Sequence, residues 1–204
     1  MSEIGIIILA AGASTRLNKP KQLVPFEGKS LLRRSADVAL ACGCDHVVVV
    51  LGYEADTLAH EVRDLPVEVV HNDDWAVGIS SSIKSGLTRL RETDPNISAV
   101  VIMLCDQPFV KEKTITSLMD NYRSTGKPIV ASEYDGILGV PALFGREMFD
   151  ALLKLEGDAG ARVVIRQNAG DRVSTIQAPE AAFDVDTIED FERMSSKVEV
   201  GPLQ

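Results

Sequence analysis

The chain has 204 residues, 45% of them hydrophobic and 25% charged, so it can bury one substantial core. Its net charge of −9 argues against binding to polymeric nucleic acid or to an anionic membrane surface, because an acidic surface repels both. Three cysteines, an odd count without framework spacing, fit a reducing compartment, and the apolar run from Ile4 to Ala11 is too short to span a bilayer. We expect a cytoplasmic protein with one domain over residues 1–194 and a flexible tail over residues 195–204.

Short apolar runs rich in Ile and Val alternate with segments of helical periodicity over the first two thirds of the chain. The runs are nearly continuous and end at polar or turn residues, which is typical of strands buried on both faces. Because parallel neighbours need crossover connections, this alternation predicts an α/β fold with a mostly parallel, Rossmann-like sheet between two layers of helices. The predicted strands are Ile4–Leu9, His46–Leu51, Val67–Val70, Ala99–Leu104 and Pro128–Ala131, and the predicted helices are Ser30–Ala41, Glu54–Arg63, Ile79–Arg91 and Lys111–Tyr122.

The alternation loosens after residue 135. No repeat, low-complexity tract or linker marks a second domain there. The elements that we expect are an apolar segment at residues 139–144, helices at Arg146–Leu155 and Ala159–Asn168, a strand at Val173–Gln177 and a closing helix at Thr187–Met194.

The segment from Leu9 to Lys21 follows the first predicted strand and places small residues before three cations. Ligands of a doubly wound sheet collect beyond the carboxyl ends of its strands, so this segment is expected at the binding site. Small side chains let backbone N–H groups approach phosphate oxygens, and Arg16 and Lys21 add positive charge. The glycine pattern of a dinucleotide fingerprint and the ending of a P-loop are both missing. The segment therefore predicts a triphosphate site, and a generic turn with surface cations is the alternative.

Further motifs follow this loop in a fixed order over nearly the whole chain. Beginning with the loop itself, they are Leu9-Ala10-Ala11-Gly12 with Arg16 and Pro20-Lys21, Asn72-Asp73-Asp74-Trp75-Ala76-Val77-Gly78-Ile79-Ser80-Ser81-Ser82, Cys105-Asp106-Gln107-Pro108, Gly139-Val140-Pro141, Gly157-Asp158-Ala159-Gly160-Ala161-Arg162 and Asp184-Val185-Asp186-Thr187. Each motif alone is weak, but the ordered set resembles the molybdenum cofactor cytidylyltransferases.

This resemblance implies a GT-A-like fold, of the kind found in nucleotide-diphospho-sugar transferases, and a nucleotidyltransferase activity. The implied reaction transfers CMP from CTP to the phosphate of a molybdopterin-type cofactor, depends on Mg²⁺ and releases pyrophosphate. Ala11 stands where guanylyl-transferring relatives usually carry Gly, which favours CTP by resemblance alone. The chain departs from the pattern of this family at Leu17-Asn18, where the family usually has Met-Gly. A molybdenum hydroxylase is the implied client.

Three aspartates are candidate metal ligands. Asp106 follows the strand Ala99–Leu104, which places it at the carboxyl edge, where a divalent cation that bridges to substrate phosphates needs an oxygen ligand. Asp184 and Asp186 are two residues apart in extended chain and therefore point the same way. The resemblance places a second metal position here; we favour Asp186, with Asp184 as its neighbour. The alternatives are that Asp106 only starts a turn and that Asp186 only caps the closing helix.

The segment Gly78–Ser82 opens a predicted helix, whose free N–H groups, hydroxyls and positive dipole end favour a nucleotide or acceptor phosphate. Helix capping by Ser80 is the alternative reading. Trp75, just before this helix, either stacks on a ring of the substrate or fills the core.

The expected reaction is in-line attack by an acceptor phosphate oxygen on the α-phosphorus of CTP, without a covalent enzyme intermediate. Such chemistry needs alignment and charge neutralisation. The residues assigned to catalysis are Arg16, Lys21 and Asp106; to nucleotide binding Leu9, Ala10, Ala11, Gly12, Ala13, Ser14, Arg16, Lys21, Asn72, Gly78, Ser80 and Ser82; to acceptor binding, by resemblance, Gly139, Pro141, Asp158 and Arg162; and to metal binding Asp106, Asp186 and Asp184.

Two other functions stay open at this point. One is guanylyl or cytidylyl transfer to another phosphorylated acceptor, such as an isoprenoid or sugar phosphate. The other is a non-catalytic carrier or insertion chaperone that holds finished molybdenum cofactor for a hydroxylase. The intact set of Arg16, Lys21, Asp106 and Asp186 argues against the carrier, because a carrier does not need residues that bind a metal triphosphate.

Overall fold

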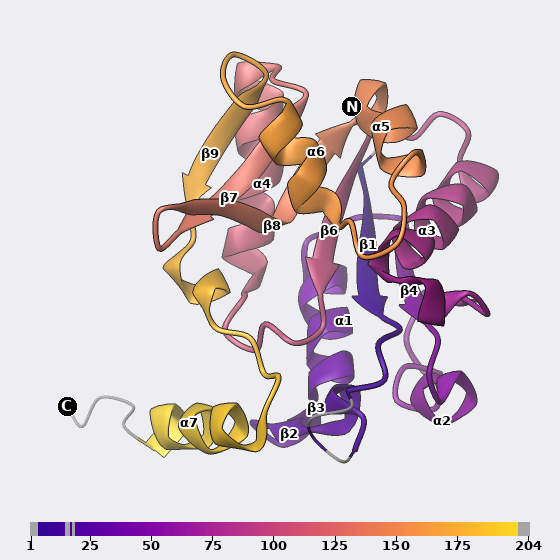
Figure 1. Ribbon diagram of the computed structural model, residues 1–204, viewed down its shortest axis with the longest axis vertical. Coiled ribbons are helices and arrows are strands. Elements are labelled where there is room, and N and C mark those ends of the chain that lie inside the picture. The colour runs from indigo at the N-terminus through magenta and orange to yellow at the C-terminus, as the bar shows by residue number, and fades with distance from the viewer. Residues whose placement is uncertain (1–3, 15–16, 18, 200–204) are drawn as a thin grey trace.

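A seven-stranded sheet forms the centre of the computed structural model, which describes residues 4–14, 17 and 19–199 (Figure 1). The strand order is β5-β4-β1-β6-β8-β7-β9. All neighbouring strands are parallel except β8, which runs antiparallel to β6 and β7. The predicted α/β fold with a mostly parallel sheet is therefore confirmed. The strands are β1 (Ile4–Ala10), β4 (Val47–Leu51), β5 (Glu68–His71), β6 (Ala99–Leu104), β7 (Ile129–Tyr134), β8 (Ile137–Gly145) and β9 (Val173–Gln177).

The reversed direction of β8 follows from the tight turn that joins it to β7. Asp135 and Gly136 have φ values of 50° and 73°, the left-handed conformations of a two-residue hairpin turn. The hairpin also lengthens β7, which ends at Tyr134 where the sequence predicted Ala131. Pairing across the hairpin, which the apolar pattern did not reveal, accounts for this longer strand.

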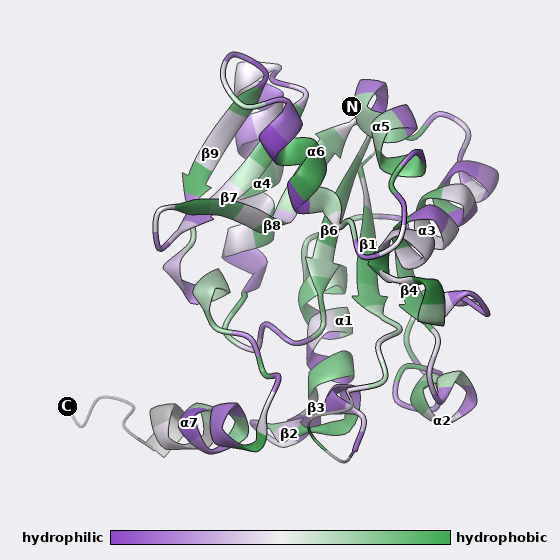
Figure 2. Cartoon of the chain, in the orientation of Figure 1, coloured by the Kyte–Doolittle hydropathy of each residue, from purple (hydrophilic) through white to green (hydrophobic). Residues whose placement is uncertain are grey.

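Helices cover both faces of the sheet, and alternate residues of β1 supply the two cores. Ile6 and Ile8 pack in the cluster that includes α1 and α4, whereas Ile7 and Leu9 pack in the cluster that includes α3, α5 and α6. Figure 2 shows β1, β4 and β6 as hydrophobic along their lengths. These helices are α1 (Leu31–Ala41), α3 (Ile79–Thr93), α4 (Glu112–Thr125), α5 (Phe149–Leu153) and α6 (Ala161–Gln167).

A third apolar cluster joins the last helix to a region near the N-terminus. Helix α7 (Ile188–Glu199) lies beside the small hairpin of β2 (Pro25–Phe26) and β3 (Lys29–Ser30), as Figure 1 shows. Met194 of α7 and Phe26 of β2 are both buried in this cluster. The packing brings the C-terminal segment next to the loop that follows β1.

Several predicted helices have different bounds in the structure. The helix expected at Glu54–Arg63 is shorter, because α2 covers Ala55–Ala59 and turns follow it. The helix expected at Arg146–Leu155 begins as a 3-10 turn before α5. Helix α7 continues to Glu199, so the part of the predicted flexible tail at residues 195–199 is helical, because helical periodicity runs on past Met194 without Gly or Pro. Across the described chain, every helix is too short or too polar to cross a membrane.

Helix α3 approaches the sheet closely at Gly86. A Cβ atom at this position would lie 2.7 Å from Cγ2 of Ile7 and 2.9 Å from Cγ2 of Val50. We predict that Gly86→Ala lowers the free energy of unfolding by about 1–3 kcal/mol through overpacking, although Ala has the higher helix propensity. Urea denaturation measures the change. The matched control Thr88→Ala, at an exposed position of α3, should change it by less than about 0.5 kcal/mol; equal effects would contradict the close packing.

Candidate active site

Lys21 lies between two carboxylates that come from distant parts of the chain. Its Nζ donates hydrogen bonds to Oδ2 of Asp106 and to Oδ1 of Asp186, the second over 2.8 Å. Lys21 begins a short 3-10 helix after the β1 loop, Asp106 follows the end of β6, and Asp186 precedes α7. The structure therefore brings together three of the residues predicted to act in catalysis and metal binding.

The two aspartates keep Lys21 charged. Its side chain is only 18% exposed, and burial alone lowers its pKa. The charge of Asp106 and the hydrogen bonds to Asp106 and Asp186 outweigh burial and raise the pKa above its ordinary value. Lys21 is therefore a fixed cation at neutral pH, suited to stabilising negative charge.

The segment before α7 holds Asp186 in place. The N–H of Val185 donates to the carbonyl oxygen of Asp106 over 2.9 Å, and the Val185 side chain is fully buried. Asp184 and Asp186 flank the buried Val185, and both are more exposed than it is. Burial and the charges of Asp106 and Asp186 raise the pKa of Asp184, which places its carboxylate in the same electrostatic cluster.

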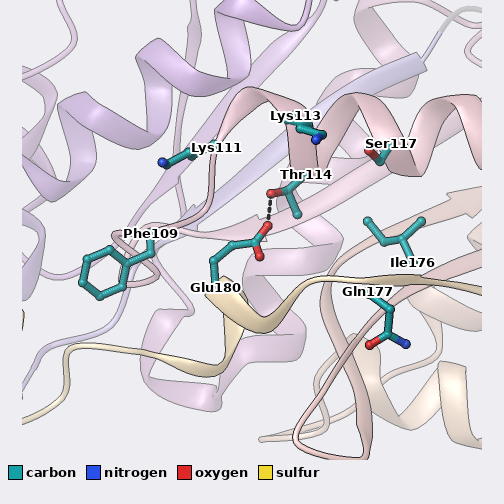
Figure 3. A pocket seen from close by; sticks show the side chains of 8 residues that line it. All are labelled: Phe109, Lys111, Lys113, Thr114, Ser117, Ile176, Gln177 and Glu180. Carbon is teal, nitrogen blue, oxygen red and sulfur yellow. Dashed lines mark hydrogen bonds between the residues drawn. The ribbon is translucent and has the colours of Figure 1, made fainter. Parts of the chain in front are cut away.

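The chain that leads to Asp186 is also attached upstream, at the 3-10 helix Pro179–Ala182. Nε2 of Gln107 donates to the carbonyl oxygen of Ala181 over 2.8 Å. The hydroxyl of Thr114 donates to the carboxylate of Glu180, which Figure 3 shows at the edge of a separate hollow of about 340 Å³. These contacts tie the chain before Asp186 to the stretch that follows β6. Gln107 belongs to the motif Cys105-Asp106-Gln107-Pro108, but the sequence alone does not assign it a role.

Asp106 and Asp186 form a donor set that fits a divalent cation. Oδ1 of Asp106 is buried and has no hydrogen-bond partner among the described residues. Carboxylate oxygens are the ligands that Mg²⁺ prefers, usually shared with substrate phosphates. Within the described ranges, no group of three or more His, Cys, Asp or Glu side chains is arranged to hold a metal. A cation at this pair would therefore take its other ligands from phosphate oxygens or water.

A cleft of about 330 Å³ runs from this cluster past the β1 loop to the start of α3. The loop residues 9–13 form a wall of this cleft, and Lys21 and Asp106 also line it. Small side chains along this wall leave the backbone open to a ligand. Ser14 turns away from the wall, and its hydroxyl accepts a hydrogen bond from the N–H of Lys21 over 3.0 Å. Arg16 lies outside the described residues. The predicted nucleotide-binding residues that line the cleft are Leu9, Ala10, Ala11, Gly12, Ala13, Lys21, Gly78 and Ser82.

The start of α3 is fixed by contacts within the protein. Gly78 has a φ of 129° and lies against the backbone of Gly157. The sequence predicts free N–H groups at the start of this helix. The N–H of Ser80 instead donates to the carbonyl oxygen of Gly157 over 3.2 Å, so it is not available to a ligand. Gly78, not Ser80, occupies the N-cap position. Asn72 is buried and donates to the hydroxyl of Ser82, which places it behind the cleft wall.

Trp75 also lines the cleft and packs edge-on against Tyr53, with ring centroids 5.6 Å apart. Gly52 makes this position possible, because a Cβ there would lie 2.7 Å from Cγ of Trp75. Of the two roles that the sequence left open for Trp75, this position favours contact with a ligand.

The predicted acceptor-binding residues fall into two places. Gly139 and Pro141 lie on β8, and Nη2 of Arg162 lies close to Gly139 and donates to the hydroxyl of Tyr134 over 3.1 Å. Asp158 instead lines the cleft, together with the start of α3. The structure therefore groups Arg162 with the β8 residues and Asp158 with the β1 loop that lines the cleft.

The sheet, the small-residue loop and the Lys21–aspartate cluster together define a nucleotidyltransferase that uses a nucleoside triphosphate. A model of the MobA-like NTP transferase domain matches residues 6–173, and the chain belongs to this family.

Relatives and solved structures cover nearly the whole chain. Nicotine blue oxidoreductase of Paenarthrobacter nicotinovorans is 32% identical over 92% of this chain and 94% of that protein. Molybdenum cofactor cytidylyltransferase of Escherichia coli K12 is 27% identical over 94% and 95%. The Rv0371c homologue from Mycobacterium sp. strain JC1 has a TM-score of 0.82 at 35% identity, covering 98% of each chain. Rv0371c of Mycobacterium tuberculosis H37Rv in complex with manganese has a TM-score of 0.77 at 28% identity, covering 95% and 98%.

We predict that Lys21→Met destabilises the metal-free protein by about 1–3 kcal/mol, because two neighbouring carboxylates lose their shared charged hydrogen-bond donor. Millimolar Mg²⁺ should then raise the Tm of the variant more than that of the wild type, because the added cation neutralises the same carboxylates. Thermal unfolding in EDTA and in Mg²⁺ measures both effects. Lys154→Met, at an exposed lysine, is the control; a Lys21→Met variant that matches it in both buffers would contradict the assignment.

Proposed function

We propose that the protein transfers CMP from CTP to the phosphate of a molybdopterin-type cofactor and releases pyrophosphate in a Mg²⁺-dependent reaction. The observation that carries this proposal is the cluster of Lys21, Asp106 and Asp186, of which Lys21 and Asp106 line the same cleft as residues 9–13. Membership of the MobA-like family and similarity to a named molybdenum cofactor cytidylyltransferase support it. The choice of cytidine rests on Ala11 and the ordered motifs.

The arrangement supports an in-line displacement at phosphorus. An acceptor phosphate oxygen forms a bond to the α-phosphorus of CTP, the bond from that phosphorus to the bridging oxygen breaks, and pyrophosphate leaves with the electron pair. In this proposal the backbone of residues 10–13 binds the β- and γ-phosphates, and Lys21 stabilises the charge that develops at the α-phosphate. Asp106 and Asp186 would hold Mg²⁺, which neutralises phosphate charge when bound.

In this proposal the cleft offers different side chains to the two parts of the nucleotide. Lys21 provides a cation for the phosphates, and Trp75 and Gly78, which also line the cleft, suit the nucleoside. The acceptor would then approach from the side of β8, where Arg162 supplies a cation for its phosphate. Rv0371c, in its manganese complex, gives a related example of divalent metal binding.

A redox reaction is the second candidate, because a relative 32% identical over nearly its whole length is named an oxidoreductase. Such an activity would leave pyrophosphate release at background. Transfer of GMP, or transfer to an isoprenoid or sugar phosphate, would keep pyrophosphate release with a different substrate. A cofactor carrier would bind the cofactor tightly and release no pyrophosphate.

We predict that Lys21→Ala and Asp106→Ala each reduce turnover by a factor of about 100 or more, because the first removes a cation at the reacting phosphate and the second removes a ligand of the Mg²⁺. Asp150→Ala, at an exposed site on α5, should keep wild-type turnover. Pyrophosphate release measures all three, and circular dichroism checks that each variant is folded. Turnover near the wild-type rate in both site variants would remove the basis for the proposed site.

A second prediction concerns substrates and metal. With a phosphorylated pterin as acceptor, we expect CTP to give faster pyrophosphate release than GTP. Excess EDTA should stop the reaction, and added Mg²⁺ or Mn²⁺ should restore it, because the two aspartates need a cation to bind the triphosphate. Activity that persists in EDTA would contradict the metal role. Faster reaction with GTP, or with a sugar or isoprenoid phosphate, would contradict the proposed substrates.

A further inference from the structure

Gln22 is a buried amide directly beside the lysine of the site. Its side chain is fully buried in the short 3-10 helix that Lys21 begins. An uncharged polar side chain is costly to bury unless it is hydrogen-bonded, so the partners of Gln22 indicate its role.

Within the described part of the chain, the hydrogen bonds of this amide lead to the β1 loop and, through Ser14, to Lys21. Nε2 of Gln22 donates to the carbonyl oxygen of Ala10 over 2.7 Å and to that of Gly12 over 2.9 Å. Its Oε1 accepts from the hydroxyl of Ser14 over 3.4 Å, and the same hydroxyl accepts from the N–H of Lys21 over 3.0 Å. These bonds link the phosphate-facing loop and Lys21 through one side chain.

The direction of the two carbonyl groups determines the direction of the next N–H groups. In a trans peptide, the carbonyl of one residue and the N–H of the following residue point to opposite sides. Because Gln22 turns the carbonyls of Ala10 and Gly12 inward, the N–H groups of Ala11 and Ala13 point away from Gln22. These four loop residues line the cleft.

We infer that Gln22 is a positioning residue, which directs the N–H groups of Ala11 and Ala13 toward the phosphates and holds Lys21 at a fixed place relative to them. This inference rests on the proposed binding of a triphosphate in the cleft. It assigns to Gln22 a role in phosphate binding without any contact between its side chain and the phosphates.

Two substitutions separate this role from simple filling of space. Gln22→Met has a similar length but no donor, so both carbonyls lose their partner. Gln22→Glu has nearly the same shape, but its carboxylate turns only acceptors toward the two carbonyls at neutral pH. When the carboxyl is protonated at lower pH, it regains one donor. Gln167→Met, at an exposed position of α6, is the matched control.

The experiment is isothermal titration calorimetry of the full chain with tripolyphosphate and Mg²⁺, and with CTP and Mg²⁺, together with KM and kcat for CTP. At pH 7 we expect Gln22→Met and Gln22→Glu to weaken binding of both probes by about 10- to 100-fold, because small displacements of binding groups have effects of this size. The affinity of Gln22→Glu relative to wild type should rise as the pH falls toward 5. Gln167→Met should bind like the wild type.

The outcomes distinguish this inference from the proposed function. If the wild type binds tripolyphosphate and a folded Gln22 variant binds it equally well, the inference is wrong while the proposed function stands. If Gln22→Met does not fold, Gln22→Glu alone tests the inference. A low affinity of Gln22→Glu for tripolyphosphate that does not recover at low pH would then count against the inference. If the wild type binds neither tripolyphosphate nor CTP, the proposed function fails and the inference fails with it.

Discussion

The pairing of Lys21 with its two aspartates is the constraint on which the site depends. Three charged side chains from the start, the middle and the end of the chain meet at one edge of the sheet, and each would be costly to bury alone. The attraction of both carboxylates to the one ammonium group lets the β1 loop, the end of β6 and the segment before α7 pack closely. The same edge carries the cleft, so the interaction that permits the packing also defines the chemistry.

The parallel strands explain why the site lies at this edge. β1 and β6 are neighbours and run in the same direction, so the loop after β1 and Asp106 after β6 emerge side by side. The hydrogen bond from Val185 to Asp106 then adds the C-terminal segment to them. The helices pack against the faces of the sheet, which leaves its carboxyl edge open to a ligand.

The sequence predicted those parts of the fold that depend on local pattern. Continuous β-branched runs identified β1, β4 and β6, and the order of motifs pointed to Lys21, Asp106 and Asp186. The antiparallel direction of β8 depends on a tight turn that the apolar periodicity does not specify. The role of Gln22 was not visible, because an amide acts through whichever carbonyls the folded chain brings within reach.

The position of Asp186 after the last strand has a consequence for how the protein is made. Translation delivers Lys21 and Asp106 well before the segment that carries the second carboxylate. A growing chain can therefore assemble its central strands while Lys21 still has one acidic partner. The complete charge cluster forms only after the segment that carries Asp186 has been made and has emerged from the ribosome, so a metal triphosphate that needs both carboxylates would bind only after that point.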